Sequence, residues 1–209
     1  MRRLPVYILV DTSGSMRGEP IEAVKVGLES LATSARRNPA TAETTWLSVI
    51  TYDLRARTIV PLTRAADFQL PEIPAPITSP TNLGEALKLL VQRFELETRV
   101  DPNDENGDCK PLLVIMTDGA PTDVAIYNRM VEKVKALPFA RIACCAAGPK
   151  AKVEPLKKLS KDVYALETLD AVAFGAFWRW TSDVVETQAA AGDDATCELP
   201  PPPDVLSFV

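Results

Sequence analysis

The segment "DTSGSM" (residues 11–16) places one carboxylate and two hydroxyls at a spacing that could bind a cation. Asp11 ends an apolar run, and Ser13 and Ser15 follow it two and four positions later. Mg²⁺ prefers hard oxygen ligands in an octahedron, and an extended turn can direct two hydroxyls of this spacing at one point. Gly14 lets the backbone bend between the serines. We therefore interpret the segment as part of a divalent-cation site.

Other chemistries for this segment fail on spacing or composition. A phosphate-binding P-loop needs a lysine directly after its second glycine, but Gly14 and Gly18 are too close together and no lysine follows. An aspartic protease motif would have its glycine one position before Gly14. A serine nucleophile elbow requires flanking glycines and a base, and the sequence contains no histidine. The lack of histidine also excludes His-ligated zinc and iron sites.

A phosphohydrolase that uses Asp11 as its nucleophile remains an alternative. Its aspartate would also follow the first parallel strand, with Mg²⁺ as cofactor. Such sites usually carry a second carboxylate two residues on, where this sequence has Ser13. Since serine does not act as a general acid near neutral pH, this alternative is the weaker one.

The composition predicts one domain with a tail. The chain has 209 residues and is 46% apolar, enough for one core, and we place a domain at 1–188 and an acidic, proline-rich tail at 189–209. The net charge is −5 and no dense basic run is present, so nucleic acid is not expected as a partner. The first apolar run is too short for a signal peptide, and no run is long enough to span a membrane. We expect a cytoplasmic monomer.

Cysteine usage predicts buried free thiols rather than disulfides or a zinc knot. The four cysteines contain no C-x-x-C pair, and Cys144 and Cys145 are adjacent within an apolar run, where a strand would point them to opposite faces. The other two are Cys109 and Cys197.

Apolar runs alternate with amphipathic stretches along most of the chain. Strands are expected at residues 4–10, 45–52, 58–62, 111–117, 139–147 and 163–166. Helices are expected at 21–35, 83–94, 124–137, 153–160 and 170–186. The link between the second and third strands is too short for a crossover helix, so these two should pair antiparallel. The pattern predicts an α/β fold with a mainly parallel six-stranded sheet and helices on both faces.

Ligands of such sheets bind at the carboxyl ends of the strands. Two further oxygen donors are expected there: Thr81, at the helix entry "SPTNLGEAL", and Asp118, after the strand in "LLVIMTDGAPTD". With "DTSGSM", three loops therefore converge on one point. We predict that Asp123 is a helix cap rather than a ligand.

The segments "ILVDTSGSM", "SPTNLGEAL" and "LLVIMTDGAPTD", in this order, resemble a von Willebrand factor A (VWA) domain with its metal-ion-dependent adhesion site (MIDAS) over about residues 4–187. The resemblance implies a three-layer doubly wound fold with strand order 3-2-1-4-5-6, strand 3 antiparallel. It implies Mg²⁺, with Mn²⁺ or Ca²⁺ as alternatives, and a protein partner that supplies an acidic side chain. The implied metal residues are Asp11, Ser13, Ser15, Thr81 and Asp118, the last acting through water.

The first 25 residues and the tail motif "ELPPPP" also resemble TerY-like tellurium-resistance proteins. This resemblance implies a non-enzymatic adaptor or scaffold in bacterial tellurium resistance or stress response. Its implied partners are a protein kinase and a PP2C-type protein phosphatase. A substrate adaptor for an AAA+ ATPase, a role of other VWA domains, is a further alternative.

Overall fold

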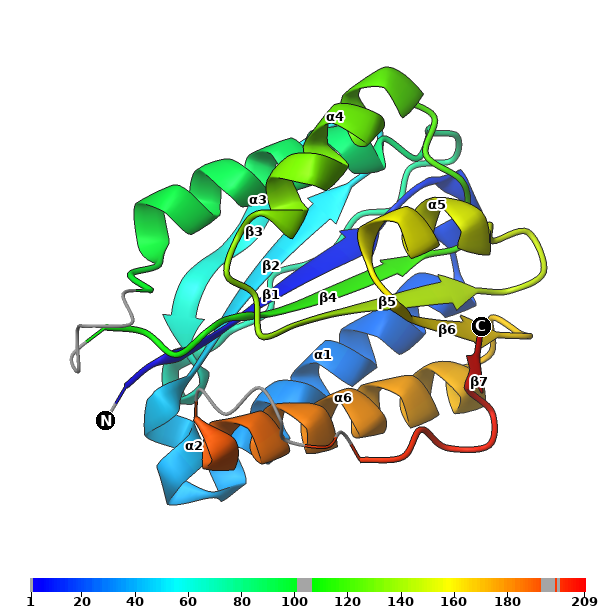
Figure 1. Ribbon diagram of the computed structural model, residues 1–209. Helices are drawn as coiled ribbons and strands as arrows, with labels where there is room; N and C mark the ends of the chain where they lie inside the picture. Colours follow the sequence, from blue (N-terminus) through cyan, green and yellow to red (C-terminus); the bar gives the residue numbers. More distant parts are fainter. Residues whose placement is uncertain (1, 101–106, 193–197, 199) are drawn as a thin grey trace.

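The computed structural model describes residues 2–100, 107–192, 198 and 200–209, which form one sheet with helices on both faces (Figure 1). The strands are β1 (Leu4–Asp11), β2 (Thr45–Tyr52), β3 (Ala56–Arg64), β4 (Leu112–Thr117), β5 (Arg141–Ala147), β6 (Asp162–Leu166) and β7 (Ser207–Phe208). The helices are α1 (Glu19–Arg37), α2 (Pro39–Thr44), α3 (Leu83–Glu97), α4 (Val124–Lys135), α5 (Val153–Leu159) and α6 (Ala171–Ala191), with 3₁₀ turns η1 (Gly14–Met16) and η2 (Ala65–Asp67).

The strand order is β3-β2-β1-β4-β5-β6-β7, which confirms the predicted order of the first six strands. β1 pairs in parallel with β2 and β4, and β3 pairs antiparallel with β2, as the short link between them requires. The prediction of six strands is wrong by one. β7 comes from the tail and pairs antiparallel with β6. A two-residue strand leaves no periodic pattern in the sequence, so only the fold reveals it.

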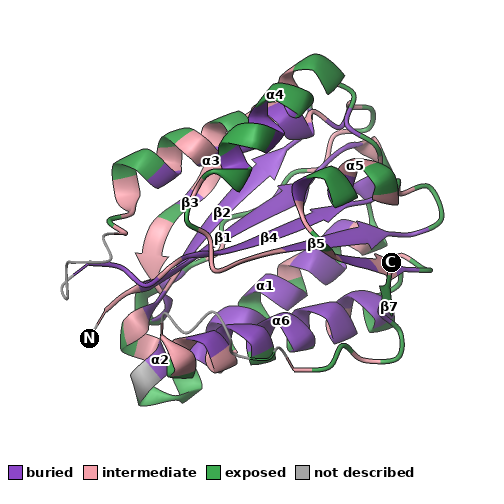
Figure 2. Cartoon of the chain, in the orientation of Figure 1, coloured by how far each residue is buried: buried purple, intermediate pink, exposed green. Residues whose placement is uncertain are grey.

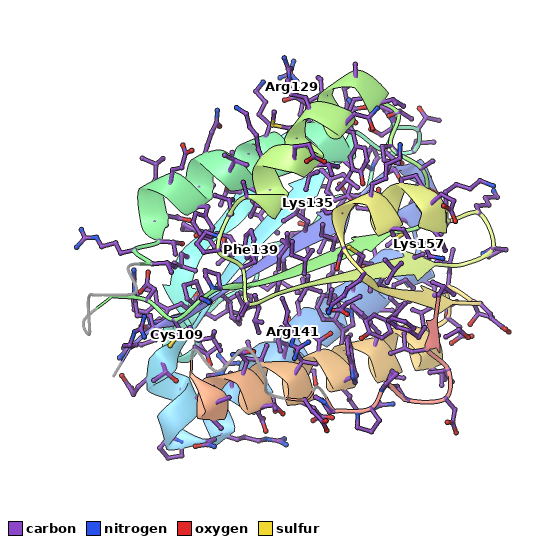
Figure 3. The ribbon with its side chains drawn as sticks, viewed as in Figure 1. Cys109, Arg129, Lys135, Phe139, Arg141 and Lys157 are labelled. Carbon is purple, nitrogen blue, oxygen red and sulfur yellow. The ribbon has the colours of Figure 1, made fainter. Side chains whose placement is uncertain are left out.

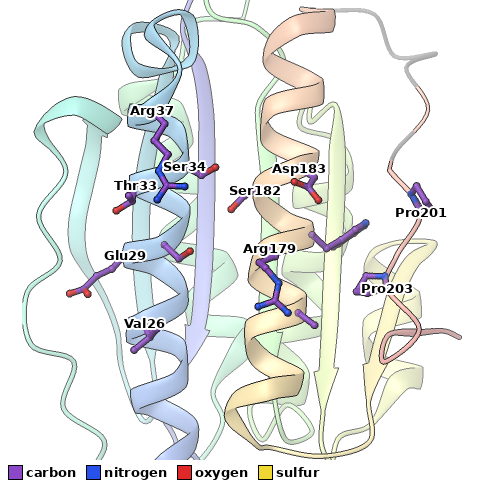
Figure 4. A pocket seen from close by; sticks show the side chains of 13 residues that line it. Val26, Glu29, Thr33, Ser34, Arg37, Arg179, Ser182, Asp183, Pro201 and Pro203 are labelled. Atoms are coloured by element: carbon purple, nitrogen blue, oxygen red, sulfur yellow. The ribbon is translucent and has the colours of Figure 1, made fainter.

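Two hydrophobic clusters lie on opposite faces of the sheet. Val6, Ile8 and Val10 of β1 belong to the cluster under α1 and α6, whereas Tyr7 and Leu9 belong to the cluster under α3, α4 and α5. β1 is therefore buried along its whole length (Figure 2), and side chains fill the space between sheet and helices (Figure 3). Burial on both faces explains why its sequence is continuously apolar rather than alternating.

The predicted helices are all present, but the short α2 was not foreseen. α1 has a proline in its first turn, as predicted, and packs closely on α6. A Cβ atom added to Gly27 of α1 would lie 2.0 Å from Cδ1 of Trp178, so glycine is required at this contact. α6 extends to Ala191, beyond the predicted end at 186.

The described end of the tail, residues 200–209, lies back on the domain, and we call it the C-terminal strap. The side chain of Leu206 is buried, and the indole of Trp180 donates a hydrogen bond of 2.9 Å to the carbonyl of Pro200. The amide of Val209 donates to the carbonyl of Val163 at 3.1 Å. The strap thus covers the β6 edge of the sheet. The division into a domain at 1–188 and a tail at 189–209 stays a prediction.

Cys144 and Cys145 are buried free thiols, as predicted, Cys109 is also buried, and Cys197 lies outside the described residues. Cys144 and Cys145 point to opposite clusters, and burial raises the pKa of both thiols. Within the described ranges, no helix is both long enough and apolar enough to cross a membrane.

Candidate metal centre

The carboxylate of Asp11 lies where the carboxyl ends of β1 and β4 meet. The parallel register pairs Val10 with Met116, so the residues that follow each of them are neighbours. The hydroxyl of Thr117 donates a hydrogen bond of 2.7 Å to Oδ2 of Asp11, and the amide of Ser13 donates one of 2.8 Å to Oδ1. Each carboxylate oxygen therefore has one fixed donor, which holds the side chain in a single orientation.

The two serines lie together beside Asp11. Oγ of Ser13 and Oγ of Ser15 are 3.3 Å apart, at the start of η1. A Cβ atom on Gly14 between them would lie 2.8 Å from the carbonyl oxygen of Ile77, so only glycine lets the loop that carries Ile77 pack here. Ser15 is exposed, which leaves one side of the site open.

Thr81 and Asp118 come to the same edge from two other loops. A Cβ atom on Gly119 would lie 3.1 Å from the hydroxyl oxygen of Thr81, so this hydroxyl lies against the residue that follows Asp118. The amide of Thr122 donates to the carbonyl of Thr81 at 2.9 Å and joins the two loops. The structure thus brings all five predicted residues to one end of the sheet. Their role as metal ligands stays a prediction.

The electrostatics of this edge are unusual, because two buried carboxylates lie near each other without a cationic side chain. Asp11 is 0% exposed and Asp118 is 3% exposed. Burial raises the pKa of Asp11 to about 6, hydrogen bonds from Thr117 and Ser13 act against this shift, and the charge of Asp118 adds to it. Among the described residues, no Lys or Arg forms an ion pair with either carboxylate, and Oδ1 of Asp118 has no hydrogen-bond partner. Such burial is unfavourable unless a positive charge compensates it.

The donor set fits a hard divalent cation. In the part of the chain that is described, no group of three or more Cys, Asp or Glu side chains gathers as a metal cluster. The oxygens at this edge belong to the carboxylates of Asp11 and Asp118 and to hydroxyls. Carboxylate and hydroxyl oxygens suit Mg²⁺, Mn²⁺ or Ca²⁺ better than softer metals. The unpartnered oxygen of Asp118 provides a further acceptor. The residues present therefore fit the group that the sequence implies.

Two residues of this region have roles that the sequence did not reveal. Thr117 orients the carboxylate of Asp11 through a hydrogen bond from its hydroxyl. The parallel pairing of β1 and β4 would have indicated this contact, because it makes the last residues of the two strands neighbours. Asp123 occupies the N-cap position of α4. Its carboxylate nevertheless accepts hydrogen bonds of 3.0 and 2.7 Å from the amides of Gly84 and Glu85, in the first turn of α3. It therefore caps α3 in place of its own helix.

Comparisons with known proteins identify related sequences and folds. A family model described as the von Willebrand factor type A domain matches residues 6–172. A comparison with curated proteins gave no match. Proximal thread matrix protein 1 (PTMP1) from the mussel byssus is similar in fold, with TM-score 0.68, 16% identity, and coverage of 87% of this chain and 48% of that chain.

Two other solved structures give similar values. The same byssus protein with a zinc-occupied MIDAS motif has TM-score 0.60 and 14% identity, covering 87% of this chain and 48% of that chain. A von Willebrand factor type A protein from Catenulispora acidiphila has TM-score 0.62 and 14% identity, covering 89% of this chain and 43% of that chain. The chain thus spans less than half the length of these structures.

Proposed function

The chain belongs to the von Willebrand factor type A domain family, and we propose that it binds a protein partner through a divalent cation held by Asp11, Ser13, Ser15, Thr81 and Asp118. Domains of this family are commonly metal-dependent interaction modules. One observation carries the proposal: Asp11 and Asp118 are buried near each other, ringed by hydroxyls, with no cationic side chain of the described residues paired to them. A bound cation would remove the unfavourable free energy of this arrangement.

Each residue has a specific part in the proposed site. Thr117 and the amide of Ser13 fix the carboxylate of Asp11 before any ligand arrives. The hydroxyls of the serines and Thr81 add neutral oxygens, and Asp118 acts through water. When bound, Mg²⁺ supplies a positive charge with an open coordination position. Because the hydroxyls carry no charge, they do not neutralise the positive charge of the cation. The open position therefore attracts an acidic side chain of a partner.

The choice of Mg²⁺ rests on the chemistry of the donors. A solved structure of the byssus protein is described with a zinc-occupied MIDAS motif, which supports a divalent cation in this fold family. The sequence of this chain contains no histidine, and its candidate donors are oxygens. Oxygen donors favour Mg²⁺, with Mn²⁺ and Ca²⁺ as alternatives.

The proposed role is recognition rather than catalysis, in a bacterial tellurium-resistance or stress system with a protein kinase and a PP2C-type phosphatase. This context rests on the resemblance of the N-terminal segment and of "ELPPPP" to TerY-like proteins. A phosphohydrolase that uses Asp11 is disfavoured, because residue 13 offers only a hydroxyl where such an enzyme needs a second carboxylate as its general acid.

A pull-down with four samples tests the proposal: wild type and Asp11→Asn, each with Mg²⁺ and with a chelator. We expect partner recovery only from wild type with Mg²⁺. Asp183→Asn, an exposed position on α6, is the matched control and should behave like wild type. Equal recovery in all four samples would contradict the metal-bridged mechanism. Mg²⁺-dependent hydrolysis of a phosphate ester that Asp11→Asn abolishes would establish the phosphohydrolase instead.

A further inference from the structure

Positive charge is concentrated in one part of this acidic chain. Residues 129–161 contain nine of the 23 Lys and Arg residues but only two of the 28 Asp and Glu residues. Among these basic residues only Lys157 and Lys158 are adjacent in sequence, so the sequence shows no dense basic run here. The fold places eight of these nine residues on two helices and the loops beside these helices, whereas Arg141 lies on β5.

Helices α4 and α5 lie next to each other on the same face of the sheet (Figure 1). The hydroxyl of Tyr127 on α4 donates a hydrogen bond of 2.6 Å to the carbonyl of Pro155 on α5. The basic residues exposed on these helices and their adjoining loops form what we call the α4–α5 basic surface; Figure 3 labels Arg129, Lys135 and Lys157. Its members are Arg129, Lys133, Lys135, Lys150, Lys152, Lys157, Lys158 and Lys161.

Most of this surface is not neutralised by neighbouring acids. Within the described residues, one member is in an ion pair: Lys135, 3.7 Å from Glu132. By contrast, two partly exposed cations elsewhere on the chain are paired: Lys25 with Glu22, and Arg64 with two acidic partners. An excess of unpaired like charges on one face creates a potential that attracts ligands of opposite charge.

The basic surface begins at the same sheet edge as the candidate metal centre. α4 starts at Val124, six residues after Asp118. Lys150 and Lys152 follow the carboxyl end of β5, which pairs in parallel with β4 and places Ala146 opposite Thr117. A protein that reaches the cation can therefore extend over α4 and α5.

We propose that the α4–α5 basic surface binds acidic residues of the same protein partner whose carboxylate binds the metal. The partner that fits this surface therefore carries a compact acidic surface beside that carboxylate. The link to the metal rests on the function proposed above, whereas the electrostatic docking rests on the basic residues alone. Seven of the eight members are lysines, whose flexible point charges suit scattered carboxylates better than the planar geometry of arginine would.

Single-stranded nucleic acid fits this surface less well. Phe139 is the one aromatic residue in 129–161, and its ring packs edge-on against Tyr7 and Phe94, so it does not offer a stacking platform. A long polyanion would also extend beyond the basic surface onto the acidic remainder of the chain. A compact acidic protein surface avoids this repulsion.

Binding of a fluorescein-labelled hexa-aspartate peptide tests the proposal, with anisotropy measured in Mg²⁺ at low and at moderate salt. The variant Lys152→Glu/Lys157→Glu reverses two charges of the basic surface. The control Arg37→Glu/Arg179→Glu makes the same change in net charge at exposed positions of α1 and α6. We expect about a tenfold loss of peptide affinity at low salt and a weaker salt dependence in the first variant, and less than about a twofold loss in the control.

The outcomes separate this proposal from the metal function. If Mg²⁺ binds, by calorimetry, but both variants lose peptide affinity equally, the docking surface is wrong and the metal function stands. If wild type does not bind Mg²⁺ but only the α4–α5 variant loses peptide affinity, the docking surface stands and the metal function fails. Two further results would overturn the docking proposal: tighter binding of a single-stranded oligonucleotide at the same lysines, or wild-type self-association that the same variant abolishes.

Discussion

The carboxylate of Asp123 accepts a hydrogen bond of 3.0 Å from the amide of Gly84, so the loop before α4 caps α3. A second bond, from the amide of Glu85, is 2.7 Å long. Asp123 follows Asp118 along its loop, and Gly84 follows Thr81 closely, so this cap holds two arms of the candidate metal centre together. A helix cap in this protein therefore also organises the site.

Replacement of Asp123 by alanine should lower the free energy of unfolding by about 1–2 kcal/mol, because α3 loses its cap. It should also weaken Mg²⁺ binding, since the Thr81 loop loses one of its attachments to the loop that carries Asp118, with the bond from Thr122 to Thr81 remaining. Urea denaturation and calorimetry measure the two effects. Asp123→Asn retains one acceptor oxygen and should lose less. Unchanged stability in Asp123→Ala would show that the cap is dispensable.

Thr117→Val should reduce Mg²⁺ affinity by about tenfold or more, because the hydroxyl that orients Asp11 acts as an outer-shell partner. Valine has nearly the same shape, so packing in β4 should change little. Thr117→Ser keeps the hydroxyl and serves as the control, with affinity close to wild type. If calorimetry gives the same affinity for valine and serine, the hydrogen bond does not tune the site.

Mg²⁺ should stabilise the wild-type protein by about 2.7 kcal/mol at a concentration of 100 times the dissociation constant. Asp11→Asn should lose this gain. Without metal, Asp11→Asn should be at least as stable as wild type, because it removes a buried carboxylate that no described cation neutralises. Denaturant titrations with Mg²⁺ and with a chelator measure both effects. A marked destabilisation of the metal-free variant would mean that Asp11 is structural.

Gly27→Ala should destabilise the contact between α1 and α6 by about 1–3 kcal/mol, since the added methyl group would overlap the indole of Trp178. Gly175→Ala on α6 is the matched control. There the nearest atom would be the flexible guanidinium of Arg179 at 3.4 Å, so alanine should be neutral or stabilising by up to about 1 kcal/mol. Thermal unfolding of both variants checks the prediction, which fails if their midpoints shift alike.

Leu206→Ala should release the C-terminal strap from the β6 edge, because the strap loses its buried anchor. The amide of Val209, which bonds to Val163, should then exchange its hydrogen faster. Val205→Ala, at a residue that is 45% exposed, should leave this exchange unchanged. Hydrogen exchange followed by NMR distinguishes the two variants. Equal protection of Val209 in both would show that Leu206 does not anchor the strap.

The sequence alone determined the features that depend on local periodicity and on motif spacing. The continuous apolar run of β1, the helical spacing in α1 and the short link before β3 predicted the sheet, its antiparallel strand and its helical covering. The rule that ligands bind at strand ends then placed Asp11, Thr81 and Asp118 at one edge. These inferences succeed because burial on both faces of a parallel sheet constrains every residue of its central strands.

Only the tertiary structure decided the features that depend on residues distant in sequence. Asp123 caps a helix that begins 40 residues earlier, and β7 pairs with β6 from the far end of the tail. The α4–α5 basic surface likewise exists only because Tyr127 and its neighbours bring two helices together. Local sequence carries no signal for such contacts, because their partners are chosen by packing and by the need to pair buried or edge groups.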